Sequence, residues 1–299
     1  MAGLFDLEFH EKKIKEYQPT LAKLDLVIDW EMFRETIEKA LYVEPKGAGG
    51  GPPFDKIMMF KILILQKYYN LSDEQTEFQI NDRTSFKQFL GLKIGDTIPD
   101  EKTIWHFKEQ LANKDLSKSL FEMFAVALMD KGIIAKEGSI VDATFVDVLK
   151  QRNSKEDNAD IKKGAVPLKF GKKDKNGKQS KLCQKDTDAR WMTKSGEKHF
   201  GFKDHINADE KTKLITKYSV TSAAPHDSTE IENIVDETDD RLNADSAYRS
   251  KEIEEHLKAI ECESFVHEKG YRGSPLTEQQ KELREPLIIN YQEHFSNLS

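Results

Sequence analysis

Residues 139–148 read SIVDATFVDV and mark the change from helical to β-strand patterns along the chain. The stretch is rich in β-branched residues and alternates in polarity, which predicts a strand. Asp142 stands in its middle, directly after Ile140 and Val141. A carboxylate that is buried without a partner costs several kcal/mol, so this position needs a partner for its charge. Asp142 is therefore the first candidate functional residue.

The segments after this strand alternate between strand and helix patterns. Strands are expected at 199–206, 213–221, 242–248 and 264–267, and helices at 227–240 and 249–259. The order βββαβαβ predicts a mixed sheet with flanking helices, and it matches the order of the ribonuclease H-like fold. His226 and Asp227 indicate the start of the first of these helices, with Asp227 as its cap.

Asp245 is the second candidate, because it ends the predicted fourth strand within NADSAY (243–248). In a ribonuclease H-like sheet the first and fourth strands are neighbours, so Asp142 and Asp245 are expected to converge. Mg²⁺ prefers oxygen ligands. Two such ions about 3.5–4 Å apart can activate water and stabilise the leaving oxygen of a phosphodiester. The alternative is that each Asp lies at an exposed strand end, capped by backbone amides.

Residues 1–132 carry helical patterns. A broad apolar face runs through 54–69, and Ser72 then predicts an N-cap with Gln75 as its capping-box partner. Two more helices are expected to start near Asp100 and Ser117. Short helices with tight connections fit a helix-turn-helix DNA-binding module, and they fit any small helical bundle equally well.

The charge of the chain is unevenly distributed. The total of 53 acidic and 46 basic residues gives −7, which by itself argues against a nucleic-acid partner. Residues 150–219, however, hold 19 Lys and Arg against 10 Asp and Glu, so this window is +9 and the rest is −16. Within this basic window, residues 150–181 are rich in Lys and Gly. This composition predicts a long mobile loop or insertion. Either a solvated linker or an arm that contacts DNA phosphates fits this composition.

Other features of the composition exclude further classes. The two cysteines, Cys183 and Cys262, form no CxxC pair, which excludes a disulfide scaffold or zinc cluster and predicts a reducing, cytoplasmic setting. The sequence has no run of about 18 apolar residues of the kind that a membrane span needs. Its start, MAGLFDLEFHEKK, lacks the pattern of a signal peptide. No membrane partner is expected.

Several ordered blocks resemble bacterial insertion-sequence transposases of the DDE type, in the group named after insertion sequence five. The blocks are LSDEQTEFQINDRTSFKQFLGL (71–92), PDEKTIWHFKEQL (99–111), VDATFV (141–146), KDTDARWMTKSGEKHFGFKDHINAD (185–209), VTSAAPHDS (220–228) and ADSAYRSKE (244–252). The resemblance extends from about residue 40 to about residue 281.

The resemblance implies two domains and a reaction on DNA. A helical DNA-binding domain is expected over 1–132 and a ribonuclease H-like catalytic domain over 133–299, with a basic insertion between its first two strands. The family binds the terminal inverted repeats of its element and moves it into target DNA by cut-and-paste strand transfer. This implies two Mg²⁺ ions, with Mn²⁺ as a substitute, a homo-oligomer assembled on double-stranded DNA, and a nucleoid-associated place in the bacterial cytoplasm.

The resemblance also assigns three catalytic acids. Asp142 matches the first and Asp245 the second, both as metal ligands. Glu293 falls near the spacing expected for the third. Around it the sequence departs from the family, because Ile289 stands where an Arg is expected and Pro286 interrupts the helix. This departure predicts a C-terminally truncated or frameshifted copy.

Four further residues are candidate DNA contacts. Arg190, Trp191 and Lys194 lie in the block that resembles the family around 185–209. Lys203 is the fourth, and it alternates with His199 and His205 along one face of a predicted strand. That polar face could line the site.

Three functions remain open from the sequence. The first is a transposase that cuts DNA with a divalent metal. The second is an inactive copy that binds inverted repeats without cutting them. The third is a metal-dependent nuclease unrelated to transposition, which the ordered family blocks disfavour.

Overall fold

The computed structural model of the chain describes residues 6–17, 19–44, 52–135, 137–167, 170–173, 179–181, 185–194 and 196–267. The chain divides into two units, Met1–Phe124 and Ala125–Ser299. Their boundary falls within one helix, Leu116–Asp130. The expected domain boundary between residues 132 and 133 stays a prediction.

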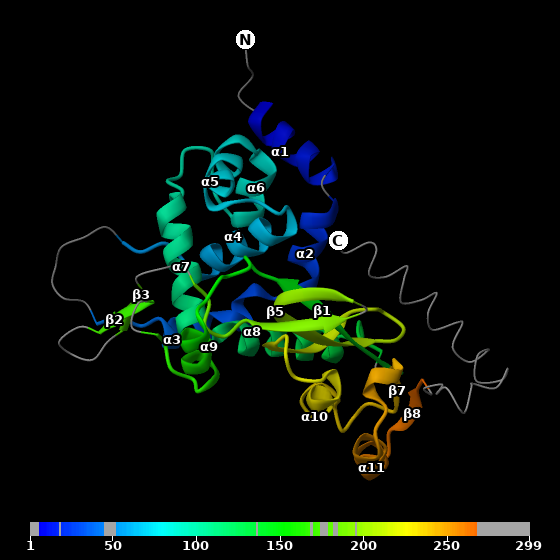
Figure 1. The fold of residues 1–299 in the computed structure, drawn as a ribbon. Helices are drawn as coiled ribbons and strands as arrows, with labels where there is room; N and C mark the ends of the chain where they lie inside the picture. Colours follow the sequence, from blue (N-terminus) through cyan, green and yellow to red (C-terminus); the bar gives the residue numbers. More distant parts are fainter. Residues whose placement is uncertain are drawn as a thin grey trace. The chain divides into compact units, whose positions relative to one another are not determined.

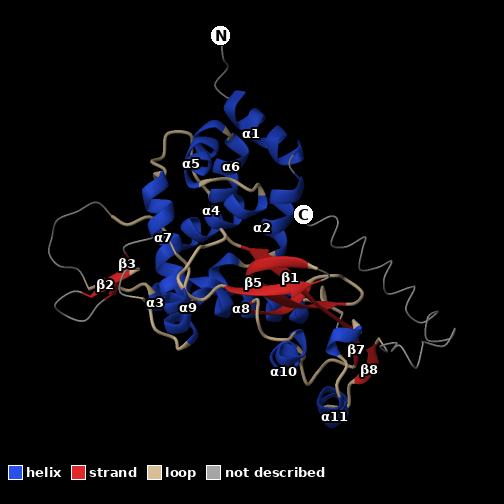
Figure 2. Cartoon of the chain, viewed as in Figure 1, coloured by secondary structure: helices blue, strands red, loops and turns tan. Residues whose placement is uncertain are grey.

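Among the described residues of the first unit, every regular element is a helix (Figure 2). Its elements are α1 (Asp6–Tyr17), α2 (Pro19–Val27), η1 (Trp30–Phe33), α3 (Arg34–Ala40), α4 (Lys56–Tyr68), α5 (Asp73–Asp82), α6 (Thr84–Leu90), α7 (Glu101–Asn113) and the first part of α8 (Leu116–Asp130). Fully buried Ile62, Leu65, Ile80, Phe86 and Ile104 come from α4, α5, α6 and α7 and join these helices in one apolar core.

The capping box predicted at the N-terminus of α5 is confirmed, and α7 starts near Asp100 as expected, with Asp100 as its cap. The Ser72 hydroxyl accepts a hydrogen bond from the Gln75 backbone N–H, and the Gln75 side chain accepts one from Ser72 N–H, both at 3.1 Å. Asp100 caps α7 by accepting a hydrogen bond from Thr103 N–H at 2.8 Å. Each cap satisfies a backbone donor that has no partner inside its helix.

The second unit is built on a mixed sheet, shown as red arrows in Figure 2. Its elements are β1 (Ser139–Asp147), α9 (Lys155–Lys162), β2 (Gly171–Lys173), β3 (Gln179–Lys181), β4 (Arg190–Lys194), β5 (Glu197–Asp209), β6 (Ile215–Ser222), η2 (Asp227–Glu230), α10 (Ile231–Ile234), β7 (Arg241–Ala244), η3 (Ser246–Tyr248), α11 (Lys251–Ala259) and β8 (Glu263–Val266). This mixed sheet with helices confirms the predicted fold class and is consistent with a ribonuclease H-like domain.

The strands of this sheet lie in the order β4-β5-β1-β7-β8, with β6 also paired to β5, whereas β2 and β3 form a separate antiparallel pair. β5 runs antiparallel to β1 along the whole of β1. On its other edge β5 pairs first with β4 and then with β6. β7 runs parallel to β1, and β8 runs parallel to β7.

One face of β1 and β7 is covered by α10 and α11, which lie on the same side of these strands (Figure 1). Val141 and Ala244 point from the sheet into this core, where Ile234 of α10 and Leu257 of α11 meet them, all fully buried. In the part of the chain that the structure describes, no helix combines the length and the apolar character that a membrane crossing requires.

The helix expected at 227–240 is much shorter in the structure. It consists of η2 and α10 and ends at Ile234, because Val235 adopts an extended backbone conformation. A turn follows, in which Asp236 N–H donates to the Asp239 carboxylate at 2.9 Å. The predicted cap is also wrong: the His226 ring, not Asp227, accepts the hydrogen bond from Ser228 N–H.

Four elements lie where no regular structure is expected: α9, β2 and β3 in the Lys-rich segment, and β4 after it. α9 forms inside the Lys-rich segment and begins with a capping box between Ser154 and Asp157. β4 forms within the block around 185–209 and pairs with the first five residues of β5. Both segments lack the apolar periodicity on which the prediction relied, so tertiary pairing and capping decide their structure.

We expect Gly201→Ala to disrupt the β1–β5 pair. Gly201 lies opposite Asp147, and a Cβ there would overlap the carbonyl oxygen of Val146, a backbone atom that cannot move aside. The loss in unfolding free energy should reach at least about 2 kcal/mol, measured by urea denaturation. Gly95→Ala is the control, because a Cβ at Gly95 meets nothing within 4 Å. Equal stability of the two variants would contradict this account.

Candidate active site

Asp142 and Asp245 are placed side by side by the pairing of β1 with β7. The last residues in register on these two parallel strands are Val141 and Ala244. Asp142 and Asp245 come next on each chain, and neighbouring strands lie about 4.8 Å apart. Two acids separated by about a hundred positions in the sequence therefore meet at one point of the sheet.

The two carboxylates differ in their local environment. Asp245 directly follows β7 and caps η3, since its Oδ1 accepts a hydrogen bond from Ala247 N–H at 2.7 Å. Asp142 lies inside β1, and its Oδ1 accepts one from Ala143 N–H at 2.8 Å. Asp245 thus resembles the capped strand-end residue that was the alternative interpretation. Asp142 does not, because it is internal to the strand.

Burial raises the pKa of Asp142 to about 6. The hydrogen bond from Ala143 N–H and the charge of Lys194 act in the opposite direction, whereas the negative charges of Asp245 and Asp227 raise this pKa further. A divalent cation would offset both the burial and the repulsion between the carboxylates. The donor set also fits, because two adjacent carboxylates supply the oxygen ligands that Mg²⁺ prefers.

A third acid is not present in the described part of this site. Within the described ranges, no group of three or more His, Cys, Asp or Glu side chains converges in a way that could hold a metal. Glu293, the predicted third acid, lies outside the described residues, as does the whole sequence around it. The structure therefore supplies a pair of carboxylates.

Lys194 and Trp191 lie on β4, at one edge of the sheet. The Lys194 ammonium group lies 5.4 Å from the centroid of the Phe145 ring, and its charge lowers the pKa of Asp142. Trp191 is 49% exposed and packs against Phe200 with ring centroids 5.0 Å apart. Both side chains are accessible close to the strand that carries Asp142.

Arg190 and Lys203 are engaged within the protein. The Arg190 guanidinium donates to the carbonyl oxygens of Thr187 and Ala189 at 2.6 and 3.0 Å, and to that of Ile161 at 3.4 Å. Lys203 is only 1% exposed. The prediction that Lys203 contacts DNA does not fit this placement, because a phosphate cannot reach its ammonium group.

The polar face of β5 is buried rather than open. His205 is fully buried, and its Nε2 lies 2.9 Å from the Thr221 hydroxyl. Burial lowers the pKa of His205, so the neutral ring is favoured. His199 stacks on Phe145, with ring centroids 4.5 Å apart. Alternation in the sequence identified this face correctly but did not show that the segment around η2 covers it.

Sequence reasoning missed the link between Asp227 and this site. Asp227 was assigned as a helix cap, but its carboxylate pairs with Lys203 at 2.7 Å. Its charge is also one of those that raise the pKa of Asp142. The signal in the sequence is the position of Asp227 within the block VTSAAPHDS (220–228).

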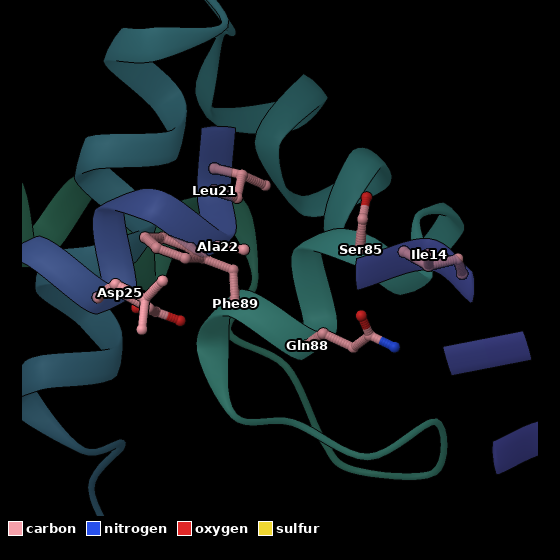
Figure 3. A pocket seen from close by; sticks show the side chains of 8 residues that line it. Ile14, Leu21, Ala22, Asp25, Ser85, Gln88 and Phe89 are labelled. Atoms are coloured by element: carbon pink, nitrogen blue, oxygen red, sulfur yellow. The ribbon is translucent and has the colours of Figure 1, made fainter. Parts of the chain in front are cut away.

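The helical unit holds a pocket of about 300 Å³ between α1, α2 and α6 (Figure 3). Its single acidic lining residue is Asp25, which accepts a hydrogen bond from the Trp30 indole N–H at 2.7 Å and pairs with Lys61 at 2.8 Å. Because this carboxylate already has both partners, the pocket offers no free acid for chemistry. The carboxylate pair of the second unit is the better candidate.

Two family models match the chain, one in each half. A model described as "Transposase domain (DUF772)" matches residues 8–110, and one described as "Transposase DDE domain" matches residues 134–291. The second match covers more than half of the chain, includes Asp142 and Asp245, and ends two residues before Glu293. No solved structure matches the chain.

We expect Asp142→Asn to stabilise the metal-free protein at neutral pH. The folded pKa of Asp142 lies above its ordinary value, so the wild-type protein loses stability as pH rises from about 4 to about 6, and Asn avoids this loss. The gain above pH 6 should be on the order of 2 kcal/mol, from urea denaturation in EDTA. It should vanish below pH 4, and a gain that is equal at every pH would contradict the assignment.

Proposed function

The chain belongs to the transposase family that carries the DDE domain, and from this we propose that it cuts and joins DNA at the ends of an insertion sequence. The observation that carries the proposal is the placement of Asp142 beside Asp245 on neighbouring parallel strands. We further propose the group named after insertion sequence five, terminal inverted repeats as the bound sites, and cut-and-paste transfer in the bacterial cytoplasm.

We propose that Asp142 and Asp245 hold divalent metal, since DDE transposases generally use such ions. The family implies two Mg²⁺ ions, for which Mn²⁺ can substitute. A bound ion would make the attacking oxygen more nucleophilic and stabilise the charge on the leaving oxygen. In each step an oxygen of water or of a DNA 3′-hydroxyl bonds to phosphorus, and the opposite P–O bond breaks, with the departing oxygen keeping the electron pair.

Glu293 is our proposal for the third acid. The match to the DDE model extends through Pro286 and Ile289, the two residues that depart from the expected pattern. That match supports treating residues 284–291 as part of the catalytic domain. The alternative is a truncated copy that binds inverted repeats without cutting them. Comparing Glu293→Gln with wild type in the cleavage assay below decides between these two proposals.

The charge distribution supports contact between DNA and the second unit. Residues 1–124 have a net charge of −4 and residues 125–299 one of −3, but the second unit concentrates a charge of +9 in its window 150–219. Since phosphate contacts supply much of the affinity for DNA, we propose that the second unit provides most of them. Trp191 and Lys194 on β4 are the proposed contacts nearest the carboxylates. The helical unit would read the inverted repeat, and the complex on DNA would be a homo-oligomer.

We expect Asp142→Asn and Asp245→Asn each to abolish nicking of an inverted-repeat duplex in Mg²⁺ or Mn²⁺. Each variant removes a carboxylate from the proposed metal site, so the rate should fall at least a thousandfold while gel-shift affinity stays within about threefold. Asp147→Asn is the control, because Asp147 lies on the same strand with its side chain 58% exposed. Its nicking rate should stay within about twofold of wild type.

The same assay separates the candidate functions. If wild type shifts the duplex but nicks it no faster than Asp142→Asn, the chain is a DNA-binding protein and the cleavage proposal fails. Nicking of any duplex at equal rate, with no preference for inverted repeats, would instead favour a general nuclease.

We expect Lys162→Ala/Lys163→Ala to reduce the salt dependence of DNA binding. Both lysines are exposed at the end of α9, in the basic window. Loss of two phosphate contacts should reduce the slope of log K against log salt by about 1.8. The control is Lys251→Ala/Lys258→Ala, which removes the same charge from exposed positions of α11. If log K depends equally on log salt in the two variants, α9 does not provide the proposed phosphate contacts.

A further inference from the structure

Lys203 is a buried cation that joins three segments of the second unit. It lies on β5 with 1% of its surface exposed. Its Nζ donates to the carbonyl oxygen of Pro225 at 2.6 Å and pairs with Asp227 Oδ1 at 2.7 Å. The same ammonium group lies 5.6 Å from the centroid of the Phe145 ring on β1. It thus ties the start of η2 to the two central strands.

Burying an ammonium group is costly, and a buried ion pair often stabilises a fold no better than an apolar pair of the same volume. Stability alone therefore does not account for this pair. The second unit holds a less buried example for comparison. Lys217 of β6 pairs with Asp236 at 3.3 Å, and these side chains are 35% and 38% exposed.

The segment that Lys203 holds leads directly to the carboxylate site. Asp227 is the first residue of η2, and η2 packs against η3. η3 is the short helix that Asp245 caps. A chain of contacts therefore runs from Lys203 through η2 and η3 to Asp245, which stands beside Asp142.

We propose that Lys203 is a positioning residue: by fixing Asp227 and Pro225 it holds η2 against η3 and so keeps Asp245 in place beside Asp142. The role in metal binding rests on the proposed function, whereas the contacts from Lys203 through η2 to η3 do not depend on it. The negative charge of Asp227 raises the pKa of Asp142, so the two carboxylates interact electrostatically. Lys203 balances this charge without itself reaching the carboxylate pair.

The test uses the full-length protein and two charge-neutral double variants. Lys203→Met/Asp227→Asn removes the buried pair and leaves neither charge unpaired, so it should fold, as checked by circular dichroism and thermal melting. Lys217→Met/Asp236→Asn makes the same exchange at the more exposed pair and is the matched control. Mn²⁺ binding is measured by electron paramagnetic resonance, with Asp142→Asn defining the ion bound at the carboxylate site.

We expect the Kd for Asp142-dependent Mn²⁺ to rise at least tenfold in Lys203→Met/Asp227→Asn and less than threefold in the control. Because neither double variant changes the net charge, long-range electrostatics does not produce this difference. The single variant Lys203→Met tests the direction in which the Kd for Mn²⁺ changes. Removing a positive charge alone would tighten Mn²⁺ binding, whereas loss of positioning weakens it.

Hydrogen exchange provides a readout that needs no metal. Amides of residues 245–249 should exchange at least tenfold faster in Lys203→Met/Asp227→Asn than in wild type, and not in the control. If wild type shows no Asp142-dependent Mn²⁺, the proposed metal site fails, and the exchange result alone decides the inference. The positioning role of Lys203 is wrong if the amides of 245–249 exchange at the wild-type rate in the folded double variant. It is also wrong if wild type binds Asp142-dependent Mn²⁺ and the double variant binds it with the same Kd.

Discussion

The parallel pairing of β1 with β7 is the constraint on which the candidate site depends. It sets Val141 opposite Ala244, and the next residue on each strand is an aspartate. The apolar residues of this pair are buried under α10 and α11, which holds the register, because a slip by one position would move Val141 out of the core. The burial that fixes the strands is thus the same burial that places the acids.

The site also shows how charge is balanced inside the second unit. The negative charges of Asp245 and Asp227 raise the pKa of Asp142, and the positive charge of Lys194 lowers it. Asp227 has its own counter-ion in buried Lys203. The remaining imbalance is negative, which favours a bound cation, while the basic window 150–219 favours the phosphates of DNA. Net charge over the whole chain conceals both tendencies, since −7 is the sum of regions with opposite signs.

Local patterns predicted much of this fold. The strand at β1, the capping box of α5 and the start of α7 near Asp100 each depend on residues within a few positions of one another, and each is confirmed. The predictions that were wrong involve distant contacts. The helix expected at 227–240 stops at Ile234, and Lys203, expected at a DNA surface, is covered by the segment around η2.

The sequence alone determined the family blocks, the two aspartates and the order βββαβαβ of the elements other than α9, β2, β3 and β4. All of these depend only on composition and on patterns of residues close together in the sequence. Tertiary structure decided that Asp142 and Asp245 are neighbours, that β4 extends the sheet, and that Lys203 is an internal tie. The physical reason is that strand register and the covering of a sheet face depend on segments far apart along the chain. Alternation shows that Lys203 and His205 share a face, but only packing shows which face is buried.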